Sequence, residues 1–310
     1  MADVATAGPA VPVVRRPRRL NLPSIIATLP MIIVSFSVFF VGIIFTIIWS
    51  FTDSGMFPNF NFVGVSQYLR LWSTDLWWIC VNNIWFFGLM SLVVNMTAGF
   101  LLAVFMDQNI KQESLFRSIF LYPFAMSLIV TGLAWQWILD PSLGVQQAVR
   151  SWGWTGFELA PLVHQETAIY GLVVAGIWQG SGVTMAIMLA GLRGVDQEVW
   201  KAARIDGIPP WRVYLFIVLP MMRGAVATAF ILQCTGIVRV YDLVIAMTRG
   251  GPGNYTYMPA MYVINFITVR LNVGQGMAAA TMMLLPIALL LVIRAIVVWW
   301  NERRAGMNAT

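Results

Sequence analysis

Two ionisable side chains lie inside an otherwise apolar stretch of the sequence. Arg239 and Asp242 fall within residues 225–247, three positions apart, so on a continuous helix they share one face. A charged group inside a membrane span costs about 2.5–3.5 kcal/mol, and this cost makes such residues candidates for function. They either neutralise each other as a structural pair or line a pathway and hydrogen-bond a solute. The residue types leave both interpretations open.

Other polar residues of the apolar stretches extend this candidate site. Tyr241 adjoins the pair, Gln233 lies about two helical turns before it, and Gln179 lies in the preceding apolar stretch. Asn265 is expected in an outer loop ahead of the last stretch. Hydroxyl-rich solutes need directional donors and acceptors beside an aromatic face. We therefore expect a substrate site formed by Gln179, Gln233, Arg239, Tyr241, Asp242 and Asn265, although packing between helices uses the same residue types.

The residues needed for catalysis or metal binding are missing from the sequence. The chain has only two lysines, Lys111 and Lys201, and neither follows a glycine, so no P-loop for ATP is present. His164 is the only histidine, which excludes a histidine metal cluster or a catalytic triad. We expect no catalytic residue, no metal site and no cofactor on this chain.

The composition places these side chains in a membrane. Of the 310 residues 59% are apolar and 10% charged, whereas soluble domains carry about 25% charged residues. Six stretches are long enough to span a bilayer, which takes about 20 helical residues. These expected spans are residues 24–51, 78–106, 115–139, 168–192, 225–247 and 274–300.

The net charge of +6 reflects topology rather than binding to nucleic acid, because the basic residues cluster in loops on one side. With the N-terminus in the cytoplasm, 13 of the 19 basic residues are on that side and four are outside, at Arg70, Arg150, Arg249 and Arg270. The 13 are Arg15, Arg16, Arg18, Arg19, Lys111, Arg117, Arg193, Lys201, Arg204, Arg212, Arg223, Arg303 and Arg304. Both termini are therefore expected in the cytoplasm.

The expected organisation is one folded membrane domain, residues 24–300, between cytoplasmic tails at residues 1–23 and 301–310. Its least apolar interior part is a cytoplasmic loop, residues 194–223. No repeat of 20–50 residues is visible, which excludes the solenoid and propeller classes.

The cytoplasmic loop reads as two short helices. Asp196 is a plausible N-cap, Gly207 can take the left-handed conformation that ends a helix, and Pro209 with Pro210 suits the start of the next helix. At helical spacing, one face is small and apolar and the other is polar. The apolar face is Val195, Val199, Ala202 and Ala203; the polar face is Gln197, Lys201 and Arg204. Such a knob fits a groove on a soluble partner, and an ordinary interfacial loop is the alternative.

The spacing in this loop is similar to a known family motif. Ala202-Ala203, Asp206-Gly207 and, further on, Leu219-Pro220 resemble the EAA loop of permease subunits in binding-protein-dependent ABC importers. Residues 240–266, VYDLVIAMTRGGPGNYTYMPAMYVINF, are similar to a segment of the sugar-importing branch of that family. Lys201 departs from the pattern, because the family usually has glutamate there.

The resemblance, closest to glucose-type and glucoside permeases, implies an all-α fold with six transmembrane helices of the type I importer class. The implied location is the cell (inner) membrane of a bacterium or archaeon. It implies that the loop couples to an ATPase through Glu198, Lys201, Ala202, Ala203, Asp206, Gly207, Leu219 and Pro220. The implied partners are a second, homologous permease, two copies of an ABC ATPase that binds ATP and Mg²⁺, and an extracytoplasmic sugar-binding protein. No nucleic-acid partner is expected.

Two other classes remain as alternatives. An ion-coupled secondary transporter or channel would use Arg239 and Asp242 as its coupling pair, but it predicts an inverted repeat that the sequence lacks. A membrane-embedded glycan or lipid transferase would need acids or histidines clustered at one interface. The outer acids Asp53, Asp75, Asp140, Glu158 and Glu166 are instead spread over separate loops.

Overall fold

The computed structural model describes residues 22–57, 59–108 and 110–307 as helices joined by loops. The chain divides into two compact units, residues 1–45 and 46–310. In the first unit, α1 (Leu22–Phe36) leads into a π-helical turn, η1 (Ser37–Val41), and the start of α2 (Gly42–Ser50). The predicted tail, residues 1–23, lies outside the described residues except for its last two.

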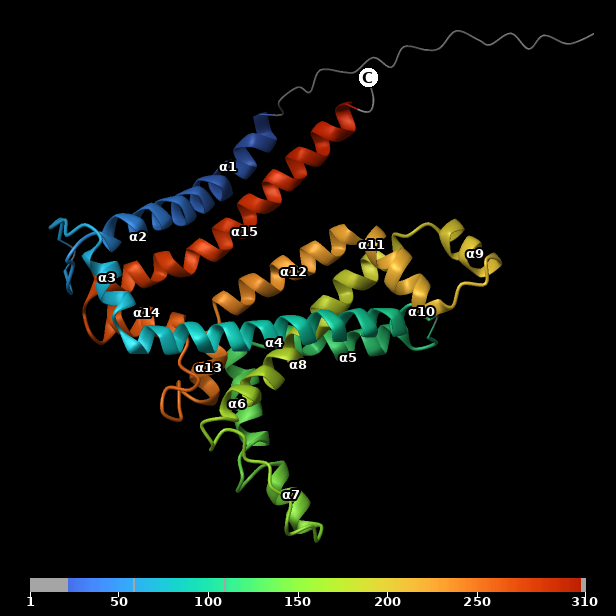
Figure 1. Ribbon diagram of the computed structural model, residues 1–310, viewed down its shortest axis with the longest axis horizontal. Helices are drawn as coiled ribbons and strands as arrows, with labels where there is room; N and C mark the ends of the chain where they lie inside the picture. Colours follow the sequence, from blue (N-terminus) through green and yellow to red (C-terminus); the bar gives the residue numbers. More distant parts are fainter. Residues whose placement is uncertain (1–21, 58, 109, 308–310) are drawn as a thin grey trace, which may run out of the picture. The chain divides into compact units, whose positions relative to one another are not determined.

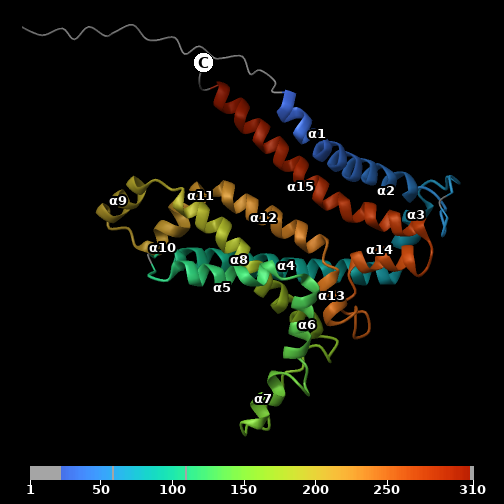
Figure 2. The same cartoon turned by 180° about the vertical axis from the view of Figure 1, so that it is seen from behind.

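The second unit is built on three helices that lie side by side (Figures 1 and 2). They are α4 (Asp75–Met106), α5 (Glu113–Ala125) and α8 (Ala168–Arg193). α4 and α8 cover the expected spans 78–106 and 168–192 and are continuously helical and apolar. Both are too long and apolar to be water-exposed surface helices. They form the scaffold that carries the polar residues of the candidate sites.

The expected span at residues 115–139 is wrong as a single helix. α5 ends at Ala125, α6 (Leu128–Ile138) begins at Leu128, and the two are bent by 100°. Pro123 removes a backbone donor near the end of α5, and the Ser127 hydroxyl caps α6 by accepting from the Val130 N–H (3.3 Å). Beyond α6, α7 (Val145–Ser151) lies in a long loop.

The expected span at residues 225–247 is also interrupted. α12 (Arg223–Val238) ends before Arg239, and α13 (Asp242–Met247) starts after Tyr241. The preceding segment contains α9 (Gln197–Ile205), α10 (Pro210–Arg212), the π-helical turn η2 (Val213–Val218) and α11 (Leu219–Met221). The helical stretch from Pro210 to Met221 is bent by 78° from α12.

The region expected as an outer loop before the last span contains a helix, α14 (Pro259–Thr268). Tyr262 and Phe266 of α14 are buried against Leu71 of α3 (Ser66–Trp72) and Trp77 of α4. This packing explains the helix, because aromatic side chains at positions i and i+4 line one face. The last helix, α15 (Val273–Met307), covers the expected span 274–300 and continues into the predicted tail 301–310.

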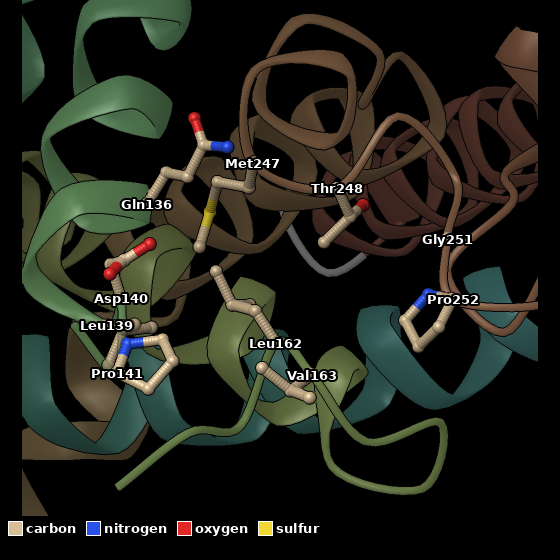
Figure 3. Close-up of a pocket in the computed structure, with 10 residues that line it drawn as sticks. All are labelled: Gln136, Leu139, Asp140, Pro141, Leu162, Val163, Met247, Thr248, Gly251 and Pro252. Carbon is tan, nitrogen blue, oxygen red and sulfur yellow. The ribbon is translucent and has the colours of Figure 1, made fainter.

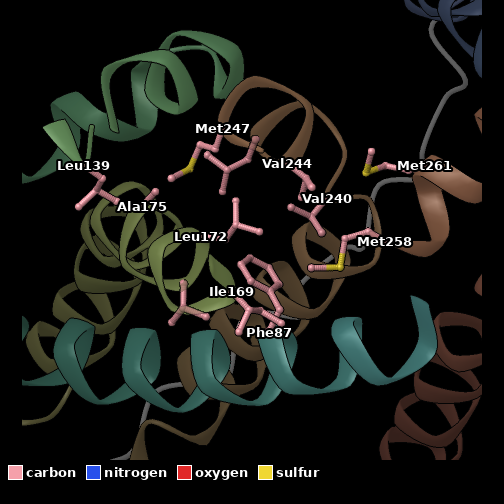
Figure 4. Close-up of a cluster of buried hydrophobic side chains, with 12 residues drawn as sticks. Phe87, Leu139, Ile169, Leu172, Ala175, Val240, Val244, Met247, Met258 and Met261 are labelled. Atoms are coloured by element: carbon pink, nitrogen blue, oxygen red, sulfur yellow. The ribbon is translucent and has the colours of Figure 1, made fainter. Parts of the chain in front are cut away.

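Buried apolar side chains of residues 46–310 form separate clusters. One joins α4, α8 and α13 and is shown in Figure 4. A second, rich in methionine, lies around the ends of α4 and α8 next to α9. Among the described residues, four helices are long and apolar enough to cross a membrane, or six if each bent pair is one span. The described part of the chain is therefore all-helical with four to six candidate spans, which confirms the predicted fold class.

Candidate functional sites

The α9 knob, residues Asp196–Ile208, has both helix ends satisfied by its own residues. The Asp196 carboxylate accepts from the Glu198 N–H (3.0 Å) at the start of α9. Gly207 has φ +67°, the Ile208 N–H donates to the Ala203 carbonyl (3.0 Å), and the Gly207 N–H donates to the Arg204 carbonyl (3.2 Å). This is the Schellman arrangement, and it confirms the predicted cap and the predicted glycine end.

One face of the knob packs on the body and the other is exposed. Ala203 is 5% exposed and joins Val195 and Ile208 against the methionine-rich cluster. The exposed face consists of Gln197, Glu198, Lys201, Ala202, Arg204, Ile205 and Asp206. Ala202 was predicted on the apolar face, and its exposure corrects that assignment. Ile205 is 85% exposed, so the outer face combines charges with one large apolar side chain.

The Leu219-Pro220 pair lies in α11, just before the bend into α12. Leu219 is half-buried and packs on the methionine-rich cluster, whereas Pro220 is exposed. A proline cannot donate the backbone hydrogen bond that continues a regular helix, and the π-helical turn η2 directly precedes it. The chain between the α9 knob and α12 is thus sharply bent just after Pro220.

A polar cluster that the sequence did not indicate lies where α4 and α8 end. Arg193, in the last turn of α8, contacts Glu113 at the start of α5 (2.8 Å) and Asp107 at the end of α4 (3.8 Å). Burial raises the pKa of Asp107, and the Arg193 guanidinium opposes this rise. The Gln108 amide donates to the Tyr214 hydroxyl (2.9 Å) of η2. No motif marks these residues, because they lie far apart in the sequence.

The helix scaffold also encloses a polar crossing, defined as Ser91, Asn95, Gly180, Thr184 and Gln233. The Gln233 amide of α12 donates to the Thr184 hydroxyl (2.7 Å) and to the Gly180 carbonyl (3.2 Å), both of α8. A Cβ at Gly180 would lie 3.1 Å from atoms of both Asn95 and Gln233. Among the described residues, Ser91 Oγ and Asn95 Oδ1 are buried without a hydrogen-bond partner. Water or a solute hydroxyl would satisfy these two atoms.

The structure does not gather the six predicted substrate residues into one site. Gln179 donates to the Met126 carbonyl (3.2 Å) between α5 and α6, and the neighbouring Gly180 receives Gln233. Asn265 is half-buried within α14 rather than in a loop. Gln179 is therefore adjacent on α8 to the glycine that accepts from Gln233, whereas Asn265 lies in α14.

Arg239 and Asp242 lie on opposite sides of the break between α12 and α13, with Tyr241 between them. Both charged residues are exposed, and no ion pair joins these two described residues. Tyr241 is half-buried against the core cluster of α13. The predicted shared helix face is wrong, because the helix stops between the two residues.

A pocket of about 310 Å³ lies between the end of α6 and the turn that follows α13 (Figure 3). Its lining includes Gln136, Asp140, Met247 and Thr248. The hydroxyl of Ser142 and two backbone N–H groups hydrogen-bond the Asp140 carboxylate and hold the pKa of Asp140 below its ordinary value. This pocket borders the Gly-Gly-Pro turn but contains none of the predicted substrate residues.

The sequence matches a described family over most of its length. The sequence model for "Binding-protein-dependent transport system inner membrane component" matches residues 95–306. A probable ABC transporter permease protein of Pyrococcus horikoshii is 34% identical over 272 residues, which cover 86% of this chain and 93% of that protein. The trehalose/maltose transport system permease protein MalF of Thermococcus litoralis is 25% identical, and the match covers 75% of this chain and 79% of that protein.

The fold also matches a solved structure. A chain in the crystal structure of a bacterial ABC transporter involved in the import of the acidic polysaccharide alginate superposes with a TM-score of 0.73. It is 18% identical, and the match covers 90% of this chain and 95% of that one. The arrangement of helices is therefore that of an ABC importer permease.

Proposed function

Because this chain belongs to the family of binding-protein-dependent transport system inner membrane components, we propose that it is the permease of a carbohydrate importer. As a family member it is a multi-pass, non-catalytic subunit of an ABC importer. The carbohydrate assignment is supported by the similarity to a permease named for trehalose and maltose. A hexose or a glucoside is the proposed solute, as in glucose-type permeases.

The α9 knob is proposed to dock into a cleft on the ATPase subunit, and its geometry is the observation that carries the proposal. A helix with satisfied ends, one small buried face and a charged outer face is too polar for lipid and is suited to a groove on a protein surface. Lys201 is exposed on that face, so the ATPase groove should offer it an acidic side chain.

The proposed complex contains a second, homologous permease, two ABC ATPase subunits that bind ATP and Mg²⁺, and an extracytoplasmic sugar-binding protein. The knob then lies in the cytoplasm with both termini. α3 and α14 lie at the opposite end of α4 and would face outward (Figure 1). Closure of the two ATPases would move the knobs together, and the bent connection through Pro220 would transmit that motion to α12.

The solute pathway is proposed to run past the break between α12 and α13. Arg239 and Asp242 are exposed there beside Tyr241, so their hydrogen-bonding groups are available to sugar hydroxyls. Gln179, Gln233 and Asn265 are proposed to line other parts of the pathway. An ion-coupled transporter is set aside, because the chain belongs to an ATP-driven family and no ion pair joins Arg239 to Asp242 in the part of the chain that the structure describes.

The test is purification of the complex from native membranes, followed by ATPase and uptake assays with glucose, a glucoside and an acidic oligosaccharide. We expect an ATPase and a second permease to accompany the parental chain, and a neutral sugar to stimulate hydrolysis. Gly207→Trp should abolish both uptake and stimulation, because it strains the left-handed position and blocks the docking face.

Gly64→Trp is the matched control for this substitution. Gly64 has φ +60° and, like Gly207, has no atom of the described residues within 4 Å of an added Cβ. A side chain there therefore suffers similar backbone strain, away from the knob. We expect Gly64→Trp to retain most uptake. Normal uptake by Gly207→Trp would contradict the docking role, and stimulation only by the acidic oligosaccharide would contradict the proposed solute.

A further inference from the structure

Tyr214 links the α9 knob to the rest of the chain. Its ring meets the ring of Trp200 from α9 edge-to-face, with centroids 5.1 Å apart. Trp200 is half-buried, whereas most of α9 is exposed. Through this aromatic pair and the buried Ala203, α9 packs on the body of the protein. The direction in which α9 points therefore depends on where the Tyr214 ring is held.

The Tyr214 hydroxyl is held by the connection between α4 and α5. Nε2 of Gln108 lies 2.9 Å from that hydroxyl and 3.4 Å from the Val104 carbonyl of α4, so one amide spans both groups. Gln108 is itself exposed, and Tyr214 is half-buried. A hydroxyl fixed by a neighbouring chain segment restricts rotation of the ring that Trp200 packs on.

Ion pairs also join the connection between α4 and α5 to the end of α8. Arg193 contacts Glu113 on one side of the connection (2.8 Å) and Asp107 on the other (3.8 Å). These ion pairs hold together the end of α4, the start of α5 and the end of α8. The hydrogen bond from Gln108 then fixes Tyr214 relative to these three helices. This path is independent of the covalent path through residues 194–196, which also joins α8 to α9.

We propose that Gln108 and Tyr214 are positioning residues that couple the α9 knob to the scaffold helices α4 and α8. The inference rests on the proposed function, because it assumes that the knob docks on an ATPase subunit. When the ATPases close, the hydrogen bond between Gln108 and Tyr214 keeps the knob rigid against α4, so that its movement shifts the helices. Without this bond α9 moves relative to α4 without shifting the helices, and less solute is transported for each ATP hydrolysed.

The experiment measures solute imported per ATP hydrolysed, using the complete complex in proteoliposomes with its binding protein. Tyr214→Phe removes the hydroxyl but keeps the ring against Trp200, and Gln108→Ala removes the other partner. Each variant should lower the ratio by about two- to tenfold, the size expected for losing one hydrogen bond. The double variant should be no worse than the more affected single variant, because both remove the same bond.

Tyr122→Phe is the control, since Tyr122 is an exposed residue of α5 outside this contact. A parental ratio in both single variants, or multiplied effects in the double variant, would overturn the inference. Loss of the Tyr214→Phe chain from the membrane, with Tyr122→Phe present, would also overturn it, because the bond would then serve folding. If no ATPase accompanies even the parental chain, the proposed function fails instead.

Discussion

The α9 knob and the break between α12 and α13 are both places where a helix stops beside exposed charged residues, but they stop for different reasons. At the knob, Asp196 begins α9 and Gly207 ends it, each through hydrogen bonds to groups within five residues. At the break, Tyr241 offers no side-chain cap to α13, and no glycine or proline lies between Val238 and Asp242. Local chemistry alone therefore accounts only for the knob.

Tertiary packing accounts for the break. Val240, Leu243 and Val244 are at most 5% exposed and lie in the cluster with Phe87 and Leu172 (Figure 4). The break between α12 and α13 lets these side chains be buried together, and the apolar area buried offsets the lost helical hydrogen bonds. The comparison shows that α9 is defined by its own sequence, whereas α13 is defined by the helices around it.

The largest loss of stability that tests whether packing determines the position of α13 is expected for a substitution at Gly132 of α6. A Cβ there would lie 2.5 Å from the Ala246 Cβ and 3.2 Å from the Leu243 carbonyl, so α6 touches α13 closely. Gly132→Ala should force the two helices apart and destabilise the protein by about 1–3 kcal/mol. Thermal unfolding of the purified chain in detergent measures this loss.

Gly236→Ala is the matched control for Gly132→Ala. Gly236 is also a helical glycine, but no atom of the residues that the structure describes lies within 4 Å of an added Cβ. It should stabilise α12 by about 0.5–1 kcal/mol through helix propensity. Equal unfolding temperatures for the two variants would mean that α6 does not determine the position of α13.

A smaller effect is expected at the end of the knob. Gly207→Ala places a Cβ in the left-handed conformation, which costs about 1–2 kcal/mol, whereas Gly207→Asn costs less because asparagine tolerates that conformation. Hydrogen exchange at the Ile208 amide should therefore rise in Gly207→Ala and change less in Gly207→Asn. Stimulated ATP hydrolysis should fall in the same order, by up to about tenfold. Similar losses in both variants would exclude backbone strain as the cause.

The sequence predicted the long helices and the knob because their signals are local. Apolar length alone places α4 and α8, and the capping residues Asp196 and Gly207 place the ends of α9. The sharp bend between α5 and α6 was missed, although Pro123 and Ser127 mark it in retrospect. Pro123 alone did not signal it, because prolines are tolerated within membrane helices.

The rest of the site could not be predicted, because it depends on contacts between residues far apart in the sequence. Gln108 and Tyr214 are 106 positions apart, and neither belongs to a recognisable motif. The sequence shows that Gln233 is a polar residue within an apolar stretch, but its partner Thr184 follows only from how α8 and α12 cross. The helix break separating Arg239 from Asp242 likewise arises from burial of the residues beside it.

The smallest effect is the coupling free energy expected from a double-mutant cycle at Arg239 and Asp242. This cycle tests directly whether the break between α12 and α13 separates the two charges. If the helix were continuous, the two charges would share one face, and their coupling would be about 0.5–3 kcal/mol. Across the break these two described residues are exposed and are not paired with each other. The effects of Arg239→Gln and Asp242→Asn on solute affinity should therefore add within about 0.5 kcal/mol. Sugar-concentration dependence of uptake by the two single variants and the double variant measures this sum. A double variant that recovers parental affinity would show that the charges meet during transport, and the break would then have to close in another state of the importer.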